Sequence, residues 1–450
     1  MKISKQLSLL LSLMLIFITA PLSAENNLSK SSSSKAPLSK IQWQQDIDKL
    51  YASICCLHPN PWRTLSAKKF KQSLQKIADA SDKSSKALTI SKLIQAVAKV
   101  SKSGEDGITG ISPFQQSTAF HLLPIQLYSF SDGMYVVSAN QEHGDLVGKQ
   151  LVSIAGVPIK DVVAKLQPYL SNESEMWSKN ISPSFVIVSE LLETLDLSSN
   201  LITSIKFTSS QGKTENRELK AITLSNYSEH VTKIEQMNTL PPVGTSDFQR
   251  QQIYSERYWY RKLDNSTLYM QYNDVQAENF NGQSFADFMH ELEMELKKFQ
   301  LQSLIVDLRF NSGSGDIFAN HRSYAAFFDL INNFESEARP LTLYVLTGRA
   351  TFAVASDFAT DIDKRTKAIF IGEKMGGALS HFAEPEQVLL INSKLKVKIA
   401  TRYWNKTLSS ATSKSLSPNF PIALSAKEYY SQIDPALIKA LQLIELSQYD

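Results

Sequence analysis

The C-terminal half of the chain alternates between short apolar segments and amphipathic segments, and this alternation restricts the folds available to it. Strands are expected at 268–272, 304–308, 343–346 and 368–371, and helices at 284–299 and 352–363. Strands that alternate with helices form a mainly parallel sheet with crossover helices. The sequence therefore predicts an α/β core at 257–450, within a multidomain α/β chain.

A helical pattern precedes this core near the N-terminus. Apolar residues recur at three- and four-residue steps from Ile41 to Ile54, and Ser66 starts a second such run. These patterns predict a helical N-terminal region at 41–115.

A β-rich pattern fills residues 116–228. Asp132-Gly133 lies between two strand-like runs and indicates a hairpin. The segment 146–159 then reads as a strand and a tight turn leading into a helix, and a helical insertion is expected at 185–195. The polar residues 229–256 are expected to connect this domain to the core.

The segment 146–159, with the helix after it, resembles the second half of a PDZ domain; a generic hairpin followed by a helix is the alternative. PDZ domains bind a peptide by adding it as a strand at a sheet edge. The resemblance therefore implies a PDZ-like domain that binds peptides or unstructured protein C-termini. We expect the peptide at an edge strand and at the Leu146–Leu151 region.

The first residues have the pattern of a cleaved export signal. A basic start leads into the apolar run 7–21, which is 15 residues long and precedes Ser23-Ala24. A membrane-spanning helix needs about 20 apolar residues, so we expect a signal peptide at 1–24 and not an anchor. The Ser/Lys-rich segment 25–40 is expected to be a disordered tether. The mature protein is then periplasmic or secreted, with no stable membrane span.

Composition and residue spacing argue against several functional classes. The 47 basic and 44 acidic residues leave a net charge of +3, too small for a dedicated nucleic-acid binder. The two cysteines and seven histidines show no zinc-like spacing, so no metal or other cofactor is expected. Cys55 and Cys56 are neighbours whose bridging would be strained, and we expect them to be small buried thiols.

Three segments of the core, in this order, resemble the tail-specific, or C-terminal-processing, serine protease family, including its tricorn-like branch. They begin at Ser303, Leu346 and Ile371 and read SLIVDLRFNSGSG, LTGRATFAVASDFA and IGEKMGG. The HPNPW segment at His58 and the end of the chain from Leu395 fit the same family. The resemblance covers nearly all of the chain after the signal peptide and implies a ClpP/crotonase-like α/β protease core.

The chemistry of that family needs a serine nucleophile, a base and an oxyanion hole. By resemblance, the nucleophile position is Ala353, which has no nucleophilic atom. The tricorn-like branch often has a histidine base where this chain has Ile108, and the other branch has a lysine where it has Ala378. The resemblance therefore implies a degenerate active site in which no catalytic residue is intact.

The expected oxyanion loop also departs from the family pattern. By resemblance, its backbone N–H groups belong to the loop of Ser312, Gly313 and Ser314 and to Val354, which follows the nucleophile position. Two glycines of the family pattern are serines in this loop. Serine side chains could crowd the loop and weaken the hole.

Two nearby residues could replace the missing catalytic pair. Ser356 lies about one helical turn after Ala353, and His381 follows the third motif. Their alternative roles are structural, as a helix-lining hydroxyl and a buried imidazole. Asp307 and Arg309 are expected to anchor their loop and not to react.

Three functions remain open at this point. The first is a pseudoprotease that binds peptides or protein C-termini. The second is an active serine-type peptidase with a non-standard catalytic layout. The third is a small-molecule or lipid binder, because alanine and isoleucine at the reacting positions make the cleft more apolar.

Overall fold

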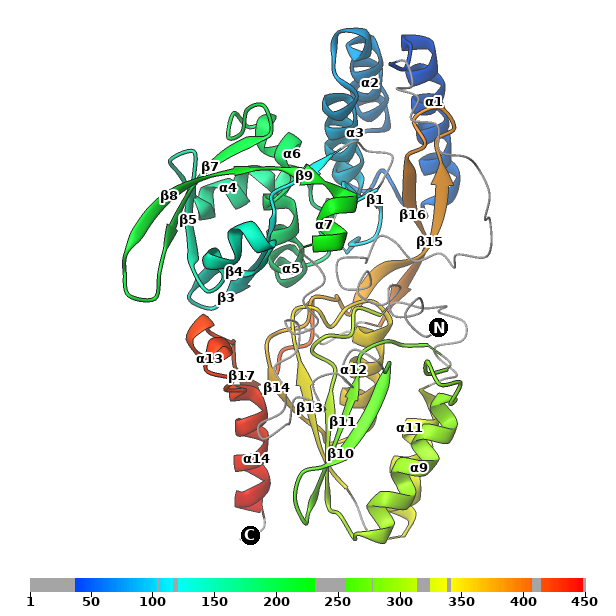
Figure 1. Ribbon diagram of the computed structural model, residues 1–450. Coiled ribbons are helices and arrows are strands. Elements are labelled where there is room, and N and C mark those ends of the chain that lie inside the picture. The colour runs from blue at the N-terminus through cyan, green and yellow to red at the C-terminus, as the bar shows by residue number, and fades with distance from the viewer. Residues whose placement is uncertain are drawn as a thin grey trace.

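The computed structural model describes residues 37–447, apart from 103–104, 116–119, 231–255, 277, 314–323, 338–340 and 407–413 (Figure 1). The predicted signal peptide, most of the predicted tether and most of the predicted connector lie outside the described residues. In the described part of the chain, no helix is long and apolar enough to cross a membrane.

Three helices form the N-terminal region, as the apolar spacing predicts. They are α1 (Lys40–Leu57), α2 (Ala67–Asp79) and α3 (Lys86–Ser101), with the short η2 (Ser81–Lys83) between the last two. The side chains of Ser39, Ser66 and Ser85 each accept a backbone N–H from the first turn of the helix that follows. Because Ser39 caps α1, this helix begins at Lys40, the last residue of the predicted tether.

The prediction that Cys55 and Cys56 are buried is wrong. Both lie near the end of α1, and both are free and exposed. Ile54 is fully buried against the other helices. Because successive side chains on a helix point about 100° apart, the two residues after Ile54 turn away from the buried face.

The β-rich region is built on a sheet with strand order β3-β4-β5-β7-β8. These strands are β3 (Ile125–Phe130), β4 (Gly133–Ala139), β5 (Gln150–Ile154), β7 (Ile202–Thr208) and β8 (Thr214–Lys220). Shorter strands are β2 (His121–Leu122), β6 (Val157–Pro158) and β9 (Ile222–Thr223). The helices are η4 (Gln141–Leu146), α4 (Ile159–Leu166), η5 (Gln167–Tyr169), α5 (Glu175–Val186), α6 (Ser189–Glu193) and α7 (Leu224–His230). The helical insertion is thus longer than the sequence predicts and starts ten residues earlier, at Glu175.

The Leu146–Leu151 region does not offer a free strand edge, contrary to expectation. In β5, Gln150 pairs with Tyr135 of β4 on one side and with Thr208 of β7 on the other. The backbone there is already hydrogen-bonded on both sides. The outer strands of this sheet are β3 and β8.

The predicted α/β core is confirmed, with strand order β10-β11-β12-β13-β14-β17. Its strands are β10 (Tyr258–Lys262), β11 (Thr267–Tyr272), β12 (Ser303–Asp307), β13 (Thr342–Thr347), β14 (Ile369–Gly372) and β17 (Phe420–Pro421). Only the β10–β11 pairing is antiparallel in this sheet as described; the others are parallel.

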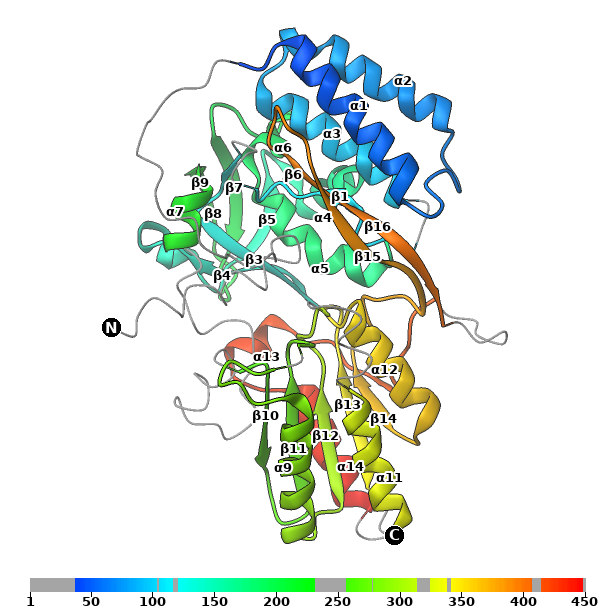
Figure 2. The same cartoon turned by 90° about the vertical axis from the view of Figure 1, so that its right-hand side faces the viewer.

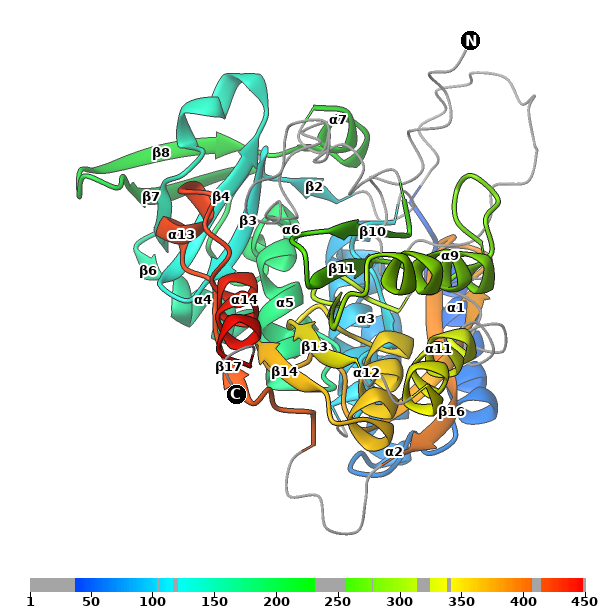
Figure 3. The ribbon, with the colours of Figure 1, turned by 90° about the horizontal axis from the view of Figure 1, so that it is seen from below.

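Helices cover both faces of the core sheet (Figures 2 and 3). One face packs against α9 (Phe285–Lys298), α11 (Ala325–Ser336) and α12 (Val354–Arg365) through a cluster rich in phenylalanine. The other face packs against α14 (Pro435–Ser447) through Leu437, Ala440 and Ile444. The core therefore has three layers, and its parallel strands are buried on both faces.

A long hairpin joins the core to the N-terminal helices (Figure 1). It consists of β15 (Ser380–Leu389) and β16 (Lys396–Asn405), and β16 also pairs with β1 (Gly110–Ile111). At its tip, the buried Asp46 of α1 accepts the backbone N–H of Asn392 at 3.0 Å and of Ser393 at 2.7 Å. This part of the C-terminal half therefore lies with the N-terminal region in space.

The segment around α13 (Ala426–Tyr430) links the core to the β-rich sheet. The Tyr430 hydroxyl donates to the carbonyl oxygen of Val136 at 2.8 Å, and the Ala426 N–H donates to Asp132 at 3.0 Å. The three regions are thus tied to one another by contacts between residues far apart in the sequence.

Candidate functional site

Ala353 occupies a strained turn between strand β13 and helix α12. It is the N-cap of α12, with φ 49° and ψ −126°, and its side chain makes no capping hydrogen bond. A positive φ is costly for any residue with a Cβ and persists only where the surroundings impose it. The turn therefore presents the side chain of position 353 at the start of the helix, as a nucleophile would require, but the side chain is a methyl group.

The glycine loop lies directly against this turn, as the resemblance implies. A Cβ on Gly313 would collide with the carbonyl oxygen of Phe352 and with the backbone nitrogen of Val354. Only glycine fits there, and its φ of +68° agrees. Ser312 is partly exposed beside it, while Ser314 lies outside the described residues.

The N–H of Gly313 is already used within its own loop. It donates to the side-chain oxygen of Asn311 at 2.9 Å. Asn311 in turn donates to the carbonyl oxygen of Tyr272 at 3.0 Å, and its own carbonyl accepts the N–H of Phe352 at 3.1 Å. An oxyanion donor must point to the place where charge develops, so this N–H is not free for that role.

The loop that carries Ile108 is brought to the same place. A Cβ on Gly107 would lie 2.6 Å from the end of the Phe352 ring, so the loop passes directly over the residue before Ala353. Ile108 is partly buried and packs, like Ala353, against the N-terminal hydrophobic core. The structure therefore brings positions 108 and 353 to one site, with hydrocarbon side chains at both.

A buried His58–Asp106 pair fixes the shape of that loop. Asp106 accepts the N–H groups of Ile108 and Thr109 at 3.0 and 2.8 Å on one oxygen, and His58 Nε2 lies 3.0 Å from the other. His58 Nδ1 accepts the N–H of Asn60 at 3.1 Å, so Nε2 carries the proton that is donated to Asp106. Both side chains are fully buried. The pair thus fixes the backbone at position 108 through the hydrogen bonds that Asp106 accepts.

Glu173 connects the two expected base positions. Its Oε1 accepts the N–H of Ala378 at 2.7 Å, and its Oε2 accepts the N–H of Gly107 at 3.2 Å. Burial raises the pKa of Glu173 well above its usual range, and the negative charges of Asp106 and Asp357 raise it further. Glu173 is thus a buried carboxyl group that favours its neutral form and holds both loops.

Ser356 and His381 are engaged elsewhere and not with each other. The Ser356 hydroxyl donates to the carbonyl oxygen of Thr351 at 3.1 Å. His381 Nδ1 lies 3.0 Å from the carbonyl oxygen of Ala378, and its Nε2 faces Asp357 at 3.9 Å. Both residues are buried, and the described residues show no hydrogen bond between them. This geometry matches the structural roles and not a nucleophile–base pair.

Two aromatic rings fill the space next to the nucleophile position. The rings of Phe352 and Trp177 are stacked, with centroids 3.6 Å apart and an interplanar angle of 11°. Both are buried. Trp177 belongs to α5, the helical insertion. The inserted helix therefore contacts the residue next to Ala353.

Asp307 and Arg309 anchor the end of strand β12, as expected. The side chain of Arg309 donates two hydrogen bonds to Asp434, at 2.8 and 2.7 Å, and three to Asp307, the shortest at 2.7 Å. Asp307 also accepts the hydroxyl of Tyr269 at 2.6 Å. This network ties the strand to the start of α14.

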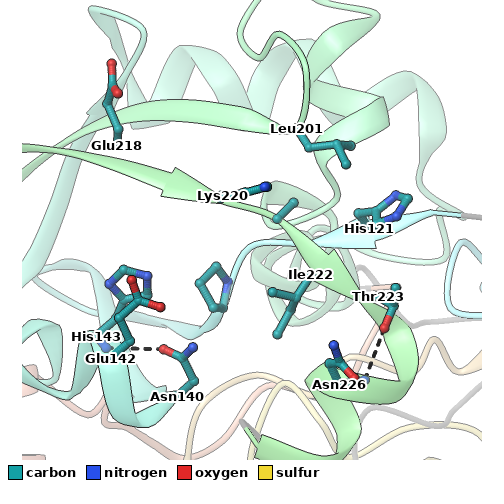
Figure 4. A pocket seen from close by; sticks show the side chains of 12 residues that line it. His121, Asn140, Glu142, His143, Leu201, Glu218, Lys220, Ile222, Thr223 and Asn226 are labelled. Atoms are coloured by element: carbon teal, nitrogen blue, oxygen red, sulfur yellow. Dashed lines mark hydrogen bonds between the residues drawn. The ribbon is translucent and has the colours of Figure 1, made fainter.

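A separate pocket of about 440 Å³ opens in the β-rich region (Figure 4). Its lining comes from β8, β9, η4, α7 and the β2–β3 segment, and includes Asn140, His143, Lys220 and Ile222. It shares no residue with the degenerate site, by which we mean positions 108, 312–313, 353–354 and 378. In the described part of the chain, no group of three or more His, Cys, Asp or Glu side chains could hold a metal ion.

Comparisons with known proteins agree with this architecture. No family model and no curated protein matches the sequence. Among solved structures, mature CPAF complexed with lactacystin is similar with a TM-score of 0.63 at 13% identity, covering 91% of this chain and 99% of that one. A second structure of mature CPAF gives 0.62 at 13% identity, covering 90% and 97%.

The chain has the fold of mature CPAF. A photosystem II D1 C-terminal processing protease is also similar, with a TM-score of 0.39 at 13% identity, covering 86% of this chain and 94% of that one. At 13% identity, the likeness to mature CPAF is one of fold.

The sequence does not point to Glu173 or Trp177 as site residues. Glu173 lies just before the inserted helix α5 and Trp177 lies within it. Neither residue belongs to one of the family motifs. Their contacts join residues up to 205 positions apart. Only the folded arrangement shows that they lie beside Ala353.

Proposed function

We propose that the mature chain is an exported pseudoprotease that binds peptides or unstructured protein C-termini without cleaving them. The observation that carries the proposal is Ala353 in the strained turn at the start of α12. A methyl group cannot attack a carbonyl carbon, however well the turn positions it. Ile108 and Ala378 at the expected base positions, and the engaged N–H of Gly313, point the same way.

The alternative of an active serine peptidase depends on Ser356. Its hydroxyl is buried and donates to Thr351, and His381 is directed to Ala378 and Asp357. Both groups would have to leave their partners before they could react. The alternative of a small-molecule or lipid binder depends on an open apolar cleft, whereas the rings of Phe352 and Trp177 next to Ala353 are buried and stacked on each other.

The test is to treat the purified mature chain, residues 25–450, with a fluorophosphonate probe and with a mixed library of unstructured peptides. We expect no labelling, no cleavage products by mass spectrometry, and measurable retention of peptides. A known active serine hydrolase, treated in parallel, shows that the probe works. Labelling that disappears in Ser356→Ala would refute the pseudoprotease and support the second layout.

A further inference from the structure

Arg349 is a buried cation with unused hydrogen-bond donors. It lies in the turn after β13, four residues before Ala353, and is 3% exposed. Among the described residues, its Nε and Nη1 have no hydrogen-bond partner, and neither has the buried Nε1 of Trp177. A Cβ on Gly376 would collide with the carbonyl oxygen of Arg349 and lie 3.4 Å from the Trp177 ring. The two residues with unused donors therefore border the same glycine.

The charges around Arg349 are not balanced. Glu373 lies 3.8 Å from Arg349 Nε, and its other oxygen lies 3.8 Å from the ammonium group of Lys179. Neither distance is short enough for a hydrogen bond. Two cations thus share one carboxylate, which leaves one positive charge in excess. The ring of Tyr128 packs against the guanidinium, with its centroid 4.3 Å from the guanidinium carbon.

These side chains come from three parts of the molecule that meet beside the degenerate site. Arg349 and Glu373 follow core strands β13 and β14, Lys179 belongs to the inserted helix α5, and Tyr128 belongs to β3. Lys179 and Tyr128 are partly exposed, while the side chain of Arg349 is 4% exposed. We call these four residues and Trp177 the Arg349 cluster.

We propose that the Arg349 cluster binds a carboxylate group of the peptide ligand, an inference that rests on the peptide-binding function proposed above. Leaving donors of a buried guanidinium unpaired is costly, and a ligand oxygen would satisfy them. The planar fork of a guanidinium matches the two oxygens of a carboxylate, and one carboxylate restores the charge balance. The carboxylate can come from the C-terminus of the peptide or from an acidic side chain.

The experiment uses the mature chain and three fluorescein-labelled pools of mixed-sequence octapeptides, followed by fluorescence anisotropy. One pool has free C-termini and no acidic residues, the second is the same pool amidated, and the third is amidated with one internal glutamate. We expect the amidated neutral pool to bind at least about tenfold more weakly than a pool with a carboxylate. Preference for the first pool identifies a C-terminal carboxylate, and preference for the third identifies a side chain.

Variants connect the effect to the cluster. Arg349→Gln should weaken binding of the preferred pool by about 10- to 100-fold and leave binding of the amidated neutral pool unchanged. Lys179→Gln is the second variant, used if Arg349→Gln fails to fold, because position 179 is partly exposed and tolerates change. It should weaken binding of the preferred pool about threefold to tenfold. The control is Lys165→Gln, at an exposed lysine of α4, which should leave binding unchanged.

The two proposals fail in different ways. If all three pools bind equally, and Lys179→Gln and Arg349→Gln leave that binding unchanged, the peptide-binding function stands and the carboxylate site is wrong. If no pool binds, both are wrong.

Discussion

The side chains at positions 353, 108 and 378 are hydrocarbon, whereas the side chains that hold their loops, Asp106 and Glu173, are polar and hydrogen-bonded. Asp106 accepts three hydrogen bonds, two from backbone N–H groups and one from His58, and Glu173 accepts two more. A side chain at a reacting position can change without leaving a buried donor unpaired. A supporting side chain cannot, because its removal exposes several donors to an apolar interior.

The comparison shows that folding and chemistry place different demands on the same site. The supporting residues keep the loops in position because the fold needs their hydrogen bonds. The reacting residues are needed for turnover alone. The proposed function thus assigns to this chain the geometry of a protease site without its reactive groups.

The largest effect is expected from removing a supporting group. Asp106→Ala leaves His58 Nε2 and the N–H groups of Ile108 and Thr109 without their acceptor, so the free energy of unfolding should fall by about 3–5 kcal/mol. Urea denaturation followed by circular dichroism measures this. The matched control is Asp161→Ala on the exposed face of α4, for which we expect a change below about 1 kcal/mol. Equal losses for the two variants would show that Asp106 is not a support.

A second test uses the titration of Glu173. Because the folded-state pKa is raised, the folded protein holds this proton more tightly than the unfolded chain. The resulting stability is fully present below the unfolded-state pKa of about 4.3 and is lost as the pH rises towards the folded-state value. The wild-type protein should therefore lose about 1 kcal/mol or more between pH 5 and 8 relative to Glu173→Gln, which does not titrate.

Urea unfolding at a series of pH values measures the difference between wild type and Glu173→Gln. At low pH the variant should be slightly less stable, because an amide NH₂ cannot accept the second backbone N–H. A constant difference across the pH range would mean that Glu173 is ionised in the folded protein.

A third test adds reactive groups to the retained scaffold. Ala353→Ser alone should neither label with a fluorophosphonate probe nor cleave peptides, because no base takes its proton. Adding Ile108→His should give weak but detectable cleavage, because a base at position 108 can take the serine proton. The rate should stay about 100-fold or more below that of an intact site, because the engaged oxyanion donor is missing in this variant too. Ala353→Ser with Ala378→Lys is the matched comparison; it should stay inactive, because position 378 is buried and too small for a lysine.

Time-dependent cleavage of an unstructured peptide distinguishes the variants. If Ala353→Ser by itself restores full labelling and turnover, a base is already present, and His381 is the first residue to examine. If the variant with histidine at position 108 stays inactive although folded, the two positions are not aligned for proton transfer.

The sequence predicts those features that depend on local periodicity or on a motif. Alternating apolar segments predict the parallel strands β11 to β14, and the order of the three motifs predicts that Gly313 and Ala353 meet. The fold-level likeness to CPAF agrees with that reading. The sequence analysis does not identify α11, although its phenylalanine and leucine spacing is a usable signal of a buried helix face.

Features that depend on distant contacts are not predicted. The β15–β16 hairpin leaves the core because Asp46, some 346 residues earlier, accepts the N–H groups at its tip. Glu173 and Trp177 enter the site only because α5 folds back over it. No local pattern around either residue indicates that contact, so the motifs point to the expected reacting positions and not to the residues that support them.

The smallest effect is expected at the two cysteines, which belong neither to the expected reacting positions nor to the residues that support them. Cys55 and Cys56 are exposed and unbridged, so Cys55→Ser and Cys56→Ser should each change the free energy of unfolding by less than about 0.5 kcal/mol. In the folded protein both thiols should react with a maleimide reagent without denaturant, giving a mass increase of two adducts by mass spectrometry. Ser53→Cys, at a buried position on the same helix, is the control, and its thiol should react only after unfolding. Failure of the native protein to take up two adducts would restore the buried or bridged interpretation that the helix geometry now argues against.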